Sequence, residues 1–425
     1  MWTALFRHFD LAFCVLSGGG FSGLKLLWLF CNAPSKIAGG VEGQWHRLNL
    51  PSLSCRWSGG RSRWGSLCTV LAAAPLLAGR AFVYAVTLAG RPGLRLVAAL
   101  GAALLVALSG LLLLLLDLPA RAAGLLRRRT SPPAAQAAVP MLEASIIVPC
   151  RGGSELLREL LPPLLADIES TPGGHEVIVV DDAGPEDLRA FLQKEFPSLR
   201  CLTLPRNLGF GGAVQHGLAA SRKPLFVLLN SDMVVRPGFL TSLLEPFDDP
   251  RVFAVCADIQ IADGVTVQTG APRGTFTGLL RLDYDEPTVL RPVLYAGGGC
   301  SAYHRAKWDY LGGFDPAYRP FYWEDVDIGF RAWRAGWLSL NQPRASVTHK
   351  HRATIASFYS PGTVERVFAA NAIYFCWKNL RSWALLARHF AYLAGRLVSS
   401  LASGDTRPAR AFLSVLPRLP RANWA

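Results

Sequence analysis

The stretch Phe321–Asp327 has residue types and spacing that could do chemistry, because three carboxylates fall within four residues directly behind three aromatic rings. Neighbouring carboxylates repel one another when they are ionised, and aromatic rings beside them lower the local dielectric. Such a cluster suits a metal site or a general base. The alternative is the N-terminal turn of a helix over 324–333, where acidic side chains interact favourably with the helix dipole. These residues alone leave both interpretations open.

The elements that would position this cluster belong to an alternating pattern that begins at Ala144, in which apolar strand-like runs are followed by turn residues and helical periodicity. The expected strands are 144–149, 176–180, 202–204 and 225–229, and the expected helices are 156–168, 186–196 and 212–221. Pro162 and Pro163 predict an interruption in the first helix. The alternation predicts an α/β domain of parallel βαβ units with ligands at the carboxyl ends of the strands.

Polar residues follow two of these expected strands. Asp181-Asp182 ends the second strand, Asn230-Ser231-Asp232 ends the fourth, and the glycine-rich stretch Arg206–Gly212 lies between them. Each feature alone is typical of an ordinary turn or helix cap. Their joint placement at one edge of the sheet predicts a ligand-binding edge.

The composition indicates membrane-embedded segments, because 51% of the residues are hydrophobic and only 17% are charged. Residues 96–116 are long and apolar enough to span a bilayer, and 70–89, which carries Arg80, is a second candidate span. Arg121 and Arg127–Arg129 follow the first span and predict a cytoplasmic location for the chain downstream. The net charge of +14 fits nucleic acid or anionic lipid, and arginines beside an apolar run favour lipid.

These features divide the chain into five parts: an unassigned segment 1–65, a transmembrane region 66–130, a Pro/Ala linker 131–143, the α/β domain 144–380 and a basic amphipathic tail 381–425. The tail is predicted to lie on an anionic membrane surface or to cap the domain as ordinary helices. The nine scattered cysteines support neither a zinc site nor a disulfide framework.

Six ordered motifs make the α/β domain resemble family 2 glycosyltransferases, most closely the rhamnosyltransferase-like branch. The motifs are Ser145–Pro149, Val179–Asp182, Asn207–Gly212, Leu229–Asp232, Gly312–Asp315 and Glu324–Asp327 with Arg331. The resemblance covers about Ala144–Leu380. It implies a GT-A fold, with a Rossmann-like nucleotide-binding half followed by an acceptor-binding half. It also implies inverting transfer of a sugar from a nucleoside-diphosphate donor, usually helped by Mg²⁺ or Mn²⁺.

The resemblance also implies roles for individual residues. Asp325 would be the general base, Glu324 and Trp323 would contact the acceptor, and Asp232 would hold the divalent metal. His349, with His351 as a competitor, would reach the metal or the diphosphate. The nucleotide pocket would be lined by Pro149, Arg151, Asp181, Asp182, Asn207, Gly209 and Gly212. Arg366 and Asn371 match a recurrent Arg and Asn of relatives, without an assigned role.

The expected function is a non-processive glycosyltransferase, since the Gln-x-x-Arg-Trp motif of processive synthases is absent after Asp327. The donor would be a dTDP- or UDP-sugar and the acceptor lipid-linked or another membrane-associated glycan, as in cell-surface polysaccharide or glycolipid assembly. The expected location is the inner or plasma membrane, with a cytoplasmic catalytic domain and no nucleic-acid partner. The alternatives are a catalytically inactive nucleotide-sugar-binding membrane protein and a nucleotidyltransferase.

Overall fold

The computed structural model describes residues 101, 104, 106–110, 142–261, 267–269, 271–286, 288–350 and 359–421. All of them belong to one compact unit, Pro75–Ala425. The predicted span 70–89, residues 1–65, two thirds of the 96–116 span and most of the linker lie outside the described residues. Within the described ranges, no helix is long and apolar enough to cross a membrane.

The first half of the domain is a parallel sheet flanked by helices. Its elements are β1 (Ala144–Cys150), α5 (Ser154–Ser170), β2 (Glu176–Asp181), α6 (Leu188–Glu195), β3 (Arg200–Thr203), α7 (Gly209–Ala220) and β4 (Leu225–Leu229). Strand β1 lies between β2 and β4 and is parallel to both, and β3 extends the sheet beside β2. The apolar runs in β1, β2 and β4 are buried on both faces of the sheet, as expected for parallel strands covered by helices.

Helix α5 is continuous through Pro162 and Pro163, so the expected interruption is wrong. A proline removes the hydrogen bond to the carbonyl four residues earlier, which here leaves the carbonyls of Arg158 and Glu159 without that donor. Arg158, Glu159 and Pro162 are all exposed, so both carbonyls lie on the face of the helix where water is available. The apolar face, with Leu157, Leu160, Leu161 and Leu164, stays packed on the sheet.

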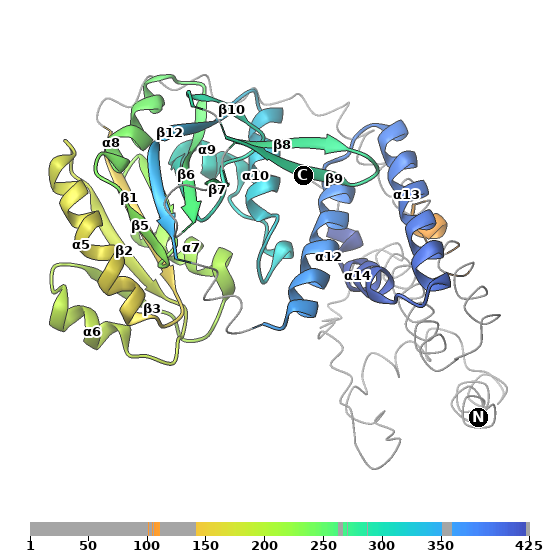
Figure 1. Ribbon diagram of the computed structural model, residues 1–425, viewed down its shortest axis with the longest axis horizontal. Coiled ribbons are helices and arrows are strands. Elements are labelled where there is room, and N and C mark those ends of the chain that lie inside the picture. The colour runs from red at the N-terminus through yellow and green to blue at the C-terminus, as the bar shows by residue number, and fades with distance from the viewer. Residues whose placement is uncertain are drawn as a thin grey trace, which may run out of the picture. The chain divides into compact units, whose positions relative to one another are not determined.

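The second half, beyond the four strands for which the sequence predicts parallel βαβ units, makes the sheet mixed. Its elements are β5 (Met233–Val235), α8 (Phe239–Leu244), η1 (Glu245–Asp248), β6 (Val252–Ile261), β7 (Val267–Thr269), β8 (Ala271–Phe276), β9 (Leu280–Asp285), β10 (Arg291–Val293), β11 (Cys300–His304), α9 (Arg305–Leu311), η2 (Pro316–Tyr318), α10 (Glu324–Arg334) and β12 (Leu338–His349). The strand order is β10-β12-β6-β11-β4-β1-β2-β3 (Figure 1). Strand β11 is antiparallel to both β4 and β6, so it joins the parallel half to the rest of the sheet.

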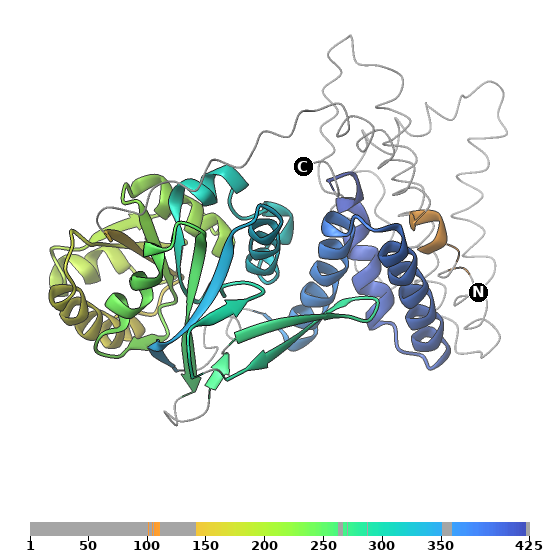
Figure 2. The same cartoon turned by 90° about the horizontal axis from the view of Figure 1, so that it is seen from above.

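A group of helices follows the sheet: α12 (Pro361–Asn379), α13 (Trp383–Ala402), α14 (Arg407–Val415) and the 3₁₀ turn η3 (Leu416–Arg421). The β8–β9 hairpin extends from the sheet to these helices in both views (Figures 1 and 2). At its tip, the carbonyl of Gly278 accepts a hydrogen bond from His389 Nδ1 of α13 at 2.6 Å. The hairpin therefore ties α13 to the α/β domain.

The apolar face of the C-terminal tail is buried inside the protein. Leu393, Leu397 and Phe412 are each at most 3% exposed and share one hydrophobic cluster with Ile373 and Trp377 of α12. This packing agrees with the alternative in which the tail caps the domain, because these three side chains pack in one cluster with α12.

Candidate active site

A cavity of about 1250 Å³ lies at the carboxyl ends of the parallel strands and continues between α10 and the C-terminal helices. We call it the cleft. Ten of the residues predicted from the sequence line it: Pro149, Arg151, Asp182, Asn207, Gly209, Asp232, Trp323, Glu324, Asp325 and His349. Asp181 and Gly212 do not line it and instead support its wall.

Asp182 organises the glycine-rich loop at one end of the cleft. Its carboxylate accepts hydrogen bonds from the backbone N–H groups of Leu208 and Gly209, at 2.6 and 2.8 Å, and from the amide of Asn207 at 2.9 Å. Burial raises the pKa of Asp182, and the two backbone N–H groups oppose that shift. Gly209 has φ +73°, a conformation that glycine adopts without strain.

Asp181 and Gly212 act from beneath this surface. The Asp181 carboxylate accepts the backbone N–H of Gly184 at 3.0 Å, which shapes the turn after β2. A Cβ on Gly212 would lie 2.5 Å from the Cβ of Leu208, so only glycine lets α7 approach the loop this closely. Both residues therefore shape the predicted nucleotide site without facing it.

Asp232 and His349 lie together, although 117 residues separate them in the chain. Asp232 follows β4 and His349 ends β12, and the antiparallel pairing of β5 with β12 brings the two segments side by side. Their Oδ2 and Nε2 atoms are 3.0 Å apart, and their side chains are 7% and 11% exposed. His351, the competing histidine, lies outside the described residues.

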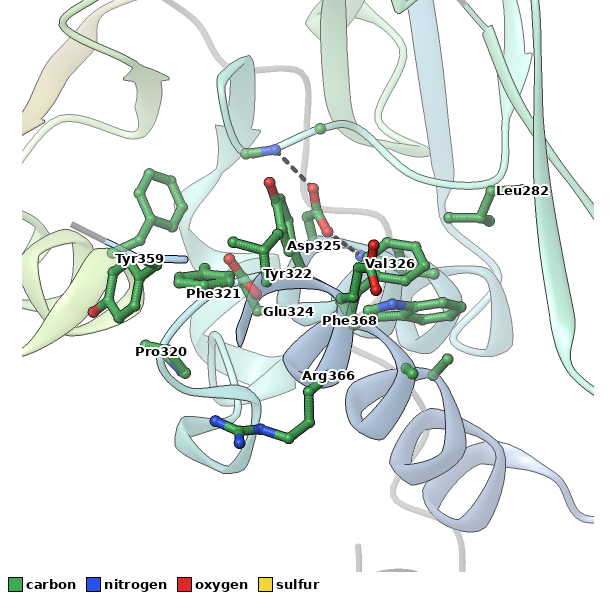
Figure 3. Close-up of a pocket in the computed structure, with 18 of the residues that line it drawn as sticks. Leu282, Pro320, Phe321, Tyr322, Glu324, Asp325, Val326, Tyr359, Arg366 and Phe368 are labelled. Atoms are coloured by element: carbon green, nitrogen blue, oxygen red, sulfur yellow. Dashed lines mark hydrogen bonds between the residues drawn. The ribbon is translucent and has the colours of Figure 1, made fainter. Parts of the chain in front are cut away.

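Glu324, which is buried, and Asp325, which is half-buried, form a carboxyl pair in the first turn of α10 (Figure 3). Asp325 accepts hydrogen bonds from the backbone N–H groups of Gly298 at 3.1 Å and Val326 at 2.8 Å. Glu324 Oε2 is buried and, among the described residues, has no hydrogen-bond partner. Burial raises the pKa of Asp325, and burial together with the charge of Asp325 raises the pKa of Glu324 to about 8.

Asp327 has a different environment from its two acidic neighbours. It is fully buried, and its carboxylate accepts hydrogen bonds from Arg331 at 2.8 Å, Lys378 at 2.9 Å, Asn379 at 2.8 Å and Tyr318 at 3.2 Å. The cluster is thus both a helix start and part of the cleft, so the two interpretations of Phe321–Asp327 are compatible. Asp327 connects α10 to α12, whereas Glu324 and Asp325 line the cleft.

Aromatic residues form the wall next to the carboxyl pair. Trp323 is only 2% exposed and packs on Phe368 and Phe375 of α12. Sequence reasoning missed Tyr284 and Tyr295, which line the cleft with their hydroxyl oxygens 2.9 Å apart. They lie on β9 and just after β10, and no local pattern in the sequence places these segments beside α10.

Glu186 was also missed, although it holds the turn between β1 and α5. Its carboxylate accepts hydrogen bonds from the backbone N–H groups of Gly153 at 2.7 Å and Ser154 at 3.0 Å. Gly152 and Gly153 both have positive φ. The paired glycines are the signal for this unusual turn, since they allow both conformations without strain.

The mixed α/β sheet, with a polar edge and an acidic cluster at the start of a helix, is a GT-A-like fold. Residues 145–311 match the model of the family described as glycosyl transferase family 2. This part of the chain is thus similar to that family, as the motifs indicated.

Two curated proteins of Mycobacterium tuberculosis are similar to the chain. N-acetylglucosaminyl-diphospho-decaprenol L-rhamnosyltransferase is 29% identical over 42% of this chain and 66% of that protein. Pre-mycofactocin glycosyltransferase is 28% identical over 67% of this chain and 62% of that protein. The chain therefore spans slightly less than two thirds of the length of either relative. A solved structure of GalNAc-T7 with UDP, GalNAc and Mn²⁺ is 16% identical, covering 67% of this chain and 56% of that one with a TM-score of 0.49.

Proposed function

We propose that this protein is an inverting, non-processive glycosyltransferase that moves one sugar from a nucleoside-diphosphate donor to a membrane-associated acceptor. The observation that carries the proposal is the convergence of three groups on one cleft. These groups are the Asp182–Gly209 loop, the Asp232–His349 pair and the Glu324–Asp325 pair. They supply, in that order, a nucleotide-binding wall, a cation site and a carboxylate base.

In this reaction Asp325 accepts the proton of the acceptor hydroxyl while the hydroxyl oxygen bonds to the anomeric carbon. The bond from that carbon to the diphosphate breaks on the opposite face, and the electron pair leaves with the diphosphate. Attack from the opposite face inverts the anomeric configuration. The N–H of Gly298, 3.1 Å from the Asp325 carboxylate, holds the base in place.

A divalent cation fits the pair Asp232 and His349, because a carboxylate oxygen and an imidazole nitrogen converge at 3.0 Å on the cleft wall. Such an ion would supply neutralisation of the charge that develops on the leaving diphosphate. These two side chains would hold it, with Mg²⁺ or Mn²⁺ as the candidates.

A lipid-linked acceptor, and a place at the cytoplasmic face of the inner or plasma membrane, complete the proposal. The support is the apolar stretch 96–116 that precedes the domain in the sequence, with its following arginines. A protein similar to this chain is named for transfer of rhamnose to a diphospho-decaprenol acceptor. Confinement of enzyme and acceptor to one surface would raise their effective concentration.

The direct test incubates purified full-length protein with UDP-, dTDP- and GDP-sugars and a membrane extract, and measures nucleoside-diphosphate release and labelled lipid. We expect one nucleotide class to support transfer of a single sugar to the lipid fraction. Long homopolymer products, or no donor turnover with any nucleotide sugar, would contradict the proposal.

A further inference from the structure

Asn371 is a fully buried residue of α12, and its side-chain amide faces the loop that leads into α10. Its Nδ2 donates to the backbone carbonyls of Tyr318 at 2.8 Å, Phe321 at 3.0 Å and Tyr322 at 2.8 Å. One side chain therefore gathers three carbonyls of the segment 318–322, which leads into Glu324. A buried carbonyl without a donor is costly, so this amide satisfies several groups at once.

The segment that Asn371 holds is strained. Tyr322 and Trp323 have φ values of +71° and +77°, although neither is glycine. A left-handed conformation is unfavourable for a residue with a side chain, and two such residues in succession need external support. The hydrogen bond to the Tyr322 carbonyl acts on the peptide unit between these two residues, directly before α10 begins.

Arg418, in the C-terminal turn η3, contacts the other end of the Asn371 amide. Its guanidinium donates to Asn371 Oδ1, and its Cζ lies 5.9 Å from the centre of the Tyr374 ring. A guanidinium can only donate and backbone carbonyls can only accept, so a single orientation of the Asn371 amide satisfies both sides. Arg418 therefore fixes which end of the amide faces the loop.

Two other side chains on the same face of α12 also contact this region. Lys378 donates to Asp315 at 2.8 Å and to Asp327 at 2.9 Å, and Tyr374 donates to Asp315 at 3.2 Å. These contacts anchor the loop and α10 at other points. Asn371 is the member of this face that bonds directly to the carbonyls before the carboxyl pair.

We infer that Asn371 and Arg418 are positioning residues for transfer: Arg418 orients Asn371, and Asn371 holds the strained Tyr322–Trp323 turn that places Asp325 in the cleft. The inference rests on the proposed function, because it assigns the C-terminal turn a part in aiming the base. The nucleotide end of the cleft, around Asp182, is separate from this connection.

Four variants of the full-length protein test the inference: Asn371→Ala, Arg418→Ala, Arg418→Lys and the double variant Asn371→Ala/Arg418→Ala. We expect kcat to fall by roughly tenfold or more for Asn371→Ala, because small misplacements of a catalytic group cost this much, while the donor KM stays within about twofold. Arg418→Lys keeps a charged donor and should recover part of the loss of Arg418→Ala. The double variant should be no slower than Asn371→Ala, since residues acting through one contact are not additive.

The control is Arg388→Ala, which removes an exposed arginine of α13 and should leave kcat unchanged. A folded Asn371→Ala with wild-type kcat, or losses that multiply in the double variant, would overturn the inference. If Asn371→Ala does not fold, Asn371→Asp replaces it. The carboxylate keeps the partner of Arg418 but has no N–H for the three carbonyls, so the same fall in kcat is expected.

Hydrogen exchange separates a failure of this inference from a failure of the proposed function. Amides of residues 322–326 should exchange at least about tenfold faster in Asn371→Ala and Arg418→Ala than in the wild type or in Arg388→Ala, because local opening becomes easier. Unchanged exchange would overturn the positioning role even if the wild type transferred no sugar. Absence of transfer by the wild type, with the exchange difference present, would instead count against the proposed function.

Discussion

The carboxylate of Asp182 accepts the backbone N–H of Gly209 at 2.8 Å, so the end of β2 is tied to the first residue of α7. The two residues lie 27 positions apart in the chain, and both line the cleft. This bond and its neighbour from Leu208 use both carboxylate oxygens. The proposed nucleotide end of the cleft therefore depends on a carboxylate that acts mainly on the protein's own backbone.

Replacing Asp182 with Asn should weaken donor binding more than catalysis. The amide nitrogen of the variant would face a backbone N–H, so a buried donor would lose its acceptor at a cost of about 1–3 kcal/mol. This corresponds to a rise of about 5- to 150-fold in donor KM, measured by initial rates against donor concentration. Asp187→Asn is the matched control, because Asp187 also accepts a backbone N–H, from Ala190 at 2.9 Å, at the start of α6. An unchanged donor KM in Asp182→Asn would contradict this role.

The pKa of Glu324 predicts an unusual dependence of stability on pH. Its pKa in the folded protein is about 8, above the ordinary value of 4.5, because of burial and the charge of Asp325. The folded protein therefore binds this proton more tightly than the unfolded chain. The resulting stability is fully present below pH 4.5 and is lost as the pH rises through about 8.

Glu324→Gln cannot ionise, so its melting temperature relative to the wild type should increase steadily between pH 4.5 and 8. For each pH unit in this interval, the free energy of unfolding of the wild type falls by at most about 1.4 kcal/mol relative to the variant. Glu169→Gln, at an exposed position of α5, controls for the general effect of removing a carboxylate. A difference in melting temperature that does not vary with pH would show that Glu324 ionises normally.

Activity should depend on a divalent cation held by Asp232 and His349. Chelation with EDTA should abolish transfer, and Mn²⁺ or Mg²⁺ should restore it. Asp232→Asn should raise the cation concentration for half-maximal activity by about tenfold or more, because a neutral amide binds a hard cation weakly. Asp248→Asn, at an exposed position in η1, should behave as the wild type. Full activity of the wild type in EDTA would contradict the cation site.

Much of the parallel half could be predicted from the sequence, because its signals are local. The apolar run Leu225–Leu229 coincides with β4, and Asp181-Asp182 ends β2 at the cleft edge as expected. The mixed part of the sheet could not be predicted in the same way. Strand β11 pairs with β4, which lies about 75 positions earlier, and the sequence of Cys300–His304 does not encode its direction.

The residues of the cleft likewise divide into those with a local sequence signal and those placed by long-range packing. Side chains that follow strands, such as Asp182 and Asp232, have a short-range pattern that indicates a ligand edge. Tyr284 and Tyr295 reach the cleft through the β8–β9 hairpin and the loop after β10. Asn371 acts from α12, a helix whose sequence shows little amphipathic periodicity. Their placement depends on tertiary packing, which a single sequence does not reveal.

The most direct test of the account is the transfer rate of Asp325→Asn with a donor that the wild type uses. A base that takes the acceptor proton contributes about 10²–10⁴-fold, so kcat should fall by that factor while the donor Kd stays within about twofold. Asp283→Asn, which changes a carboxylate of β9, should retain normal transfer. A folded Asp325→Asn protein that transfers sugar at the wild-type rate would contradict the account.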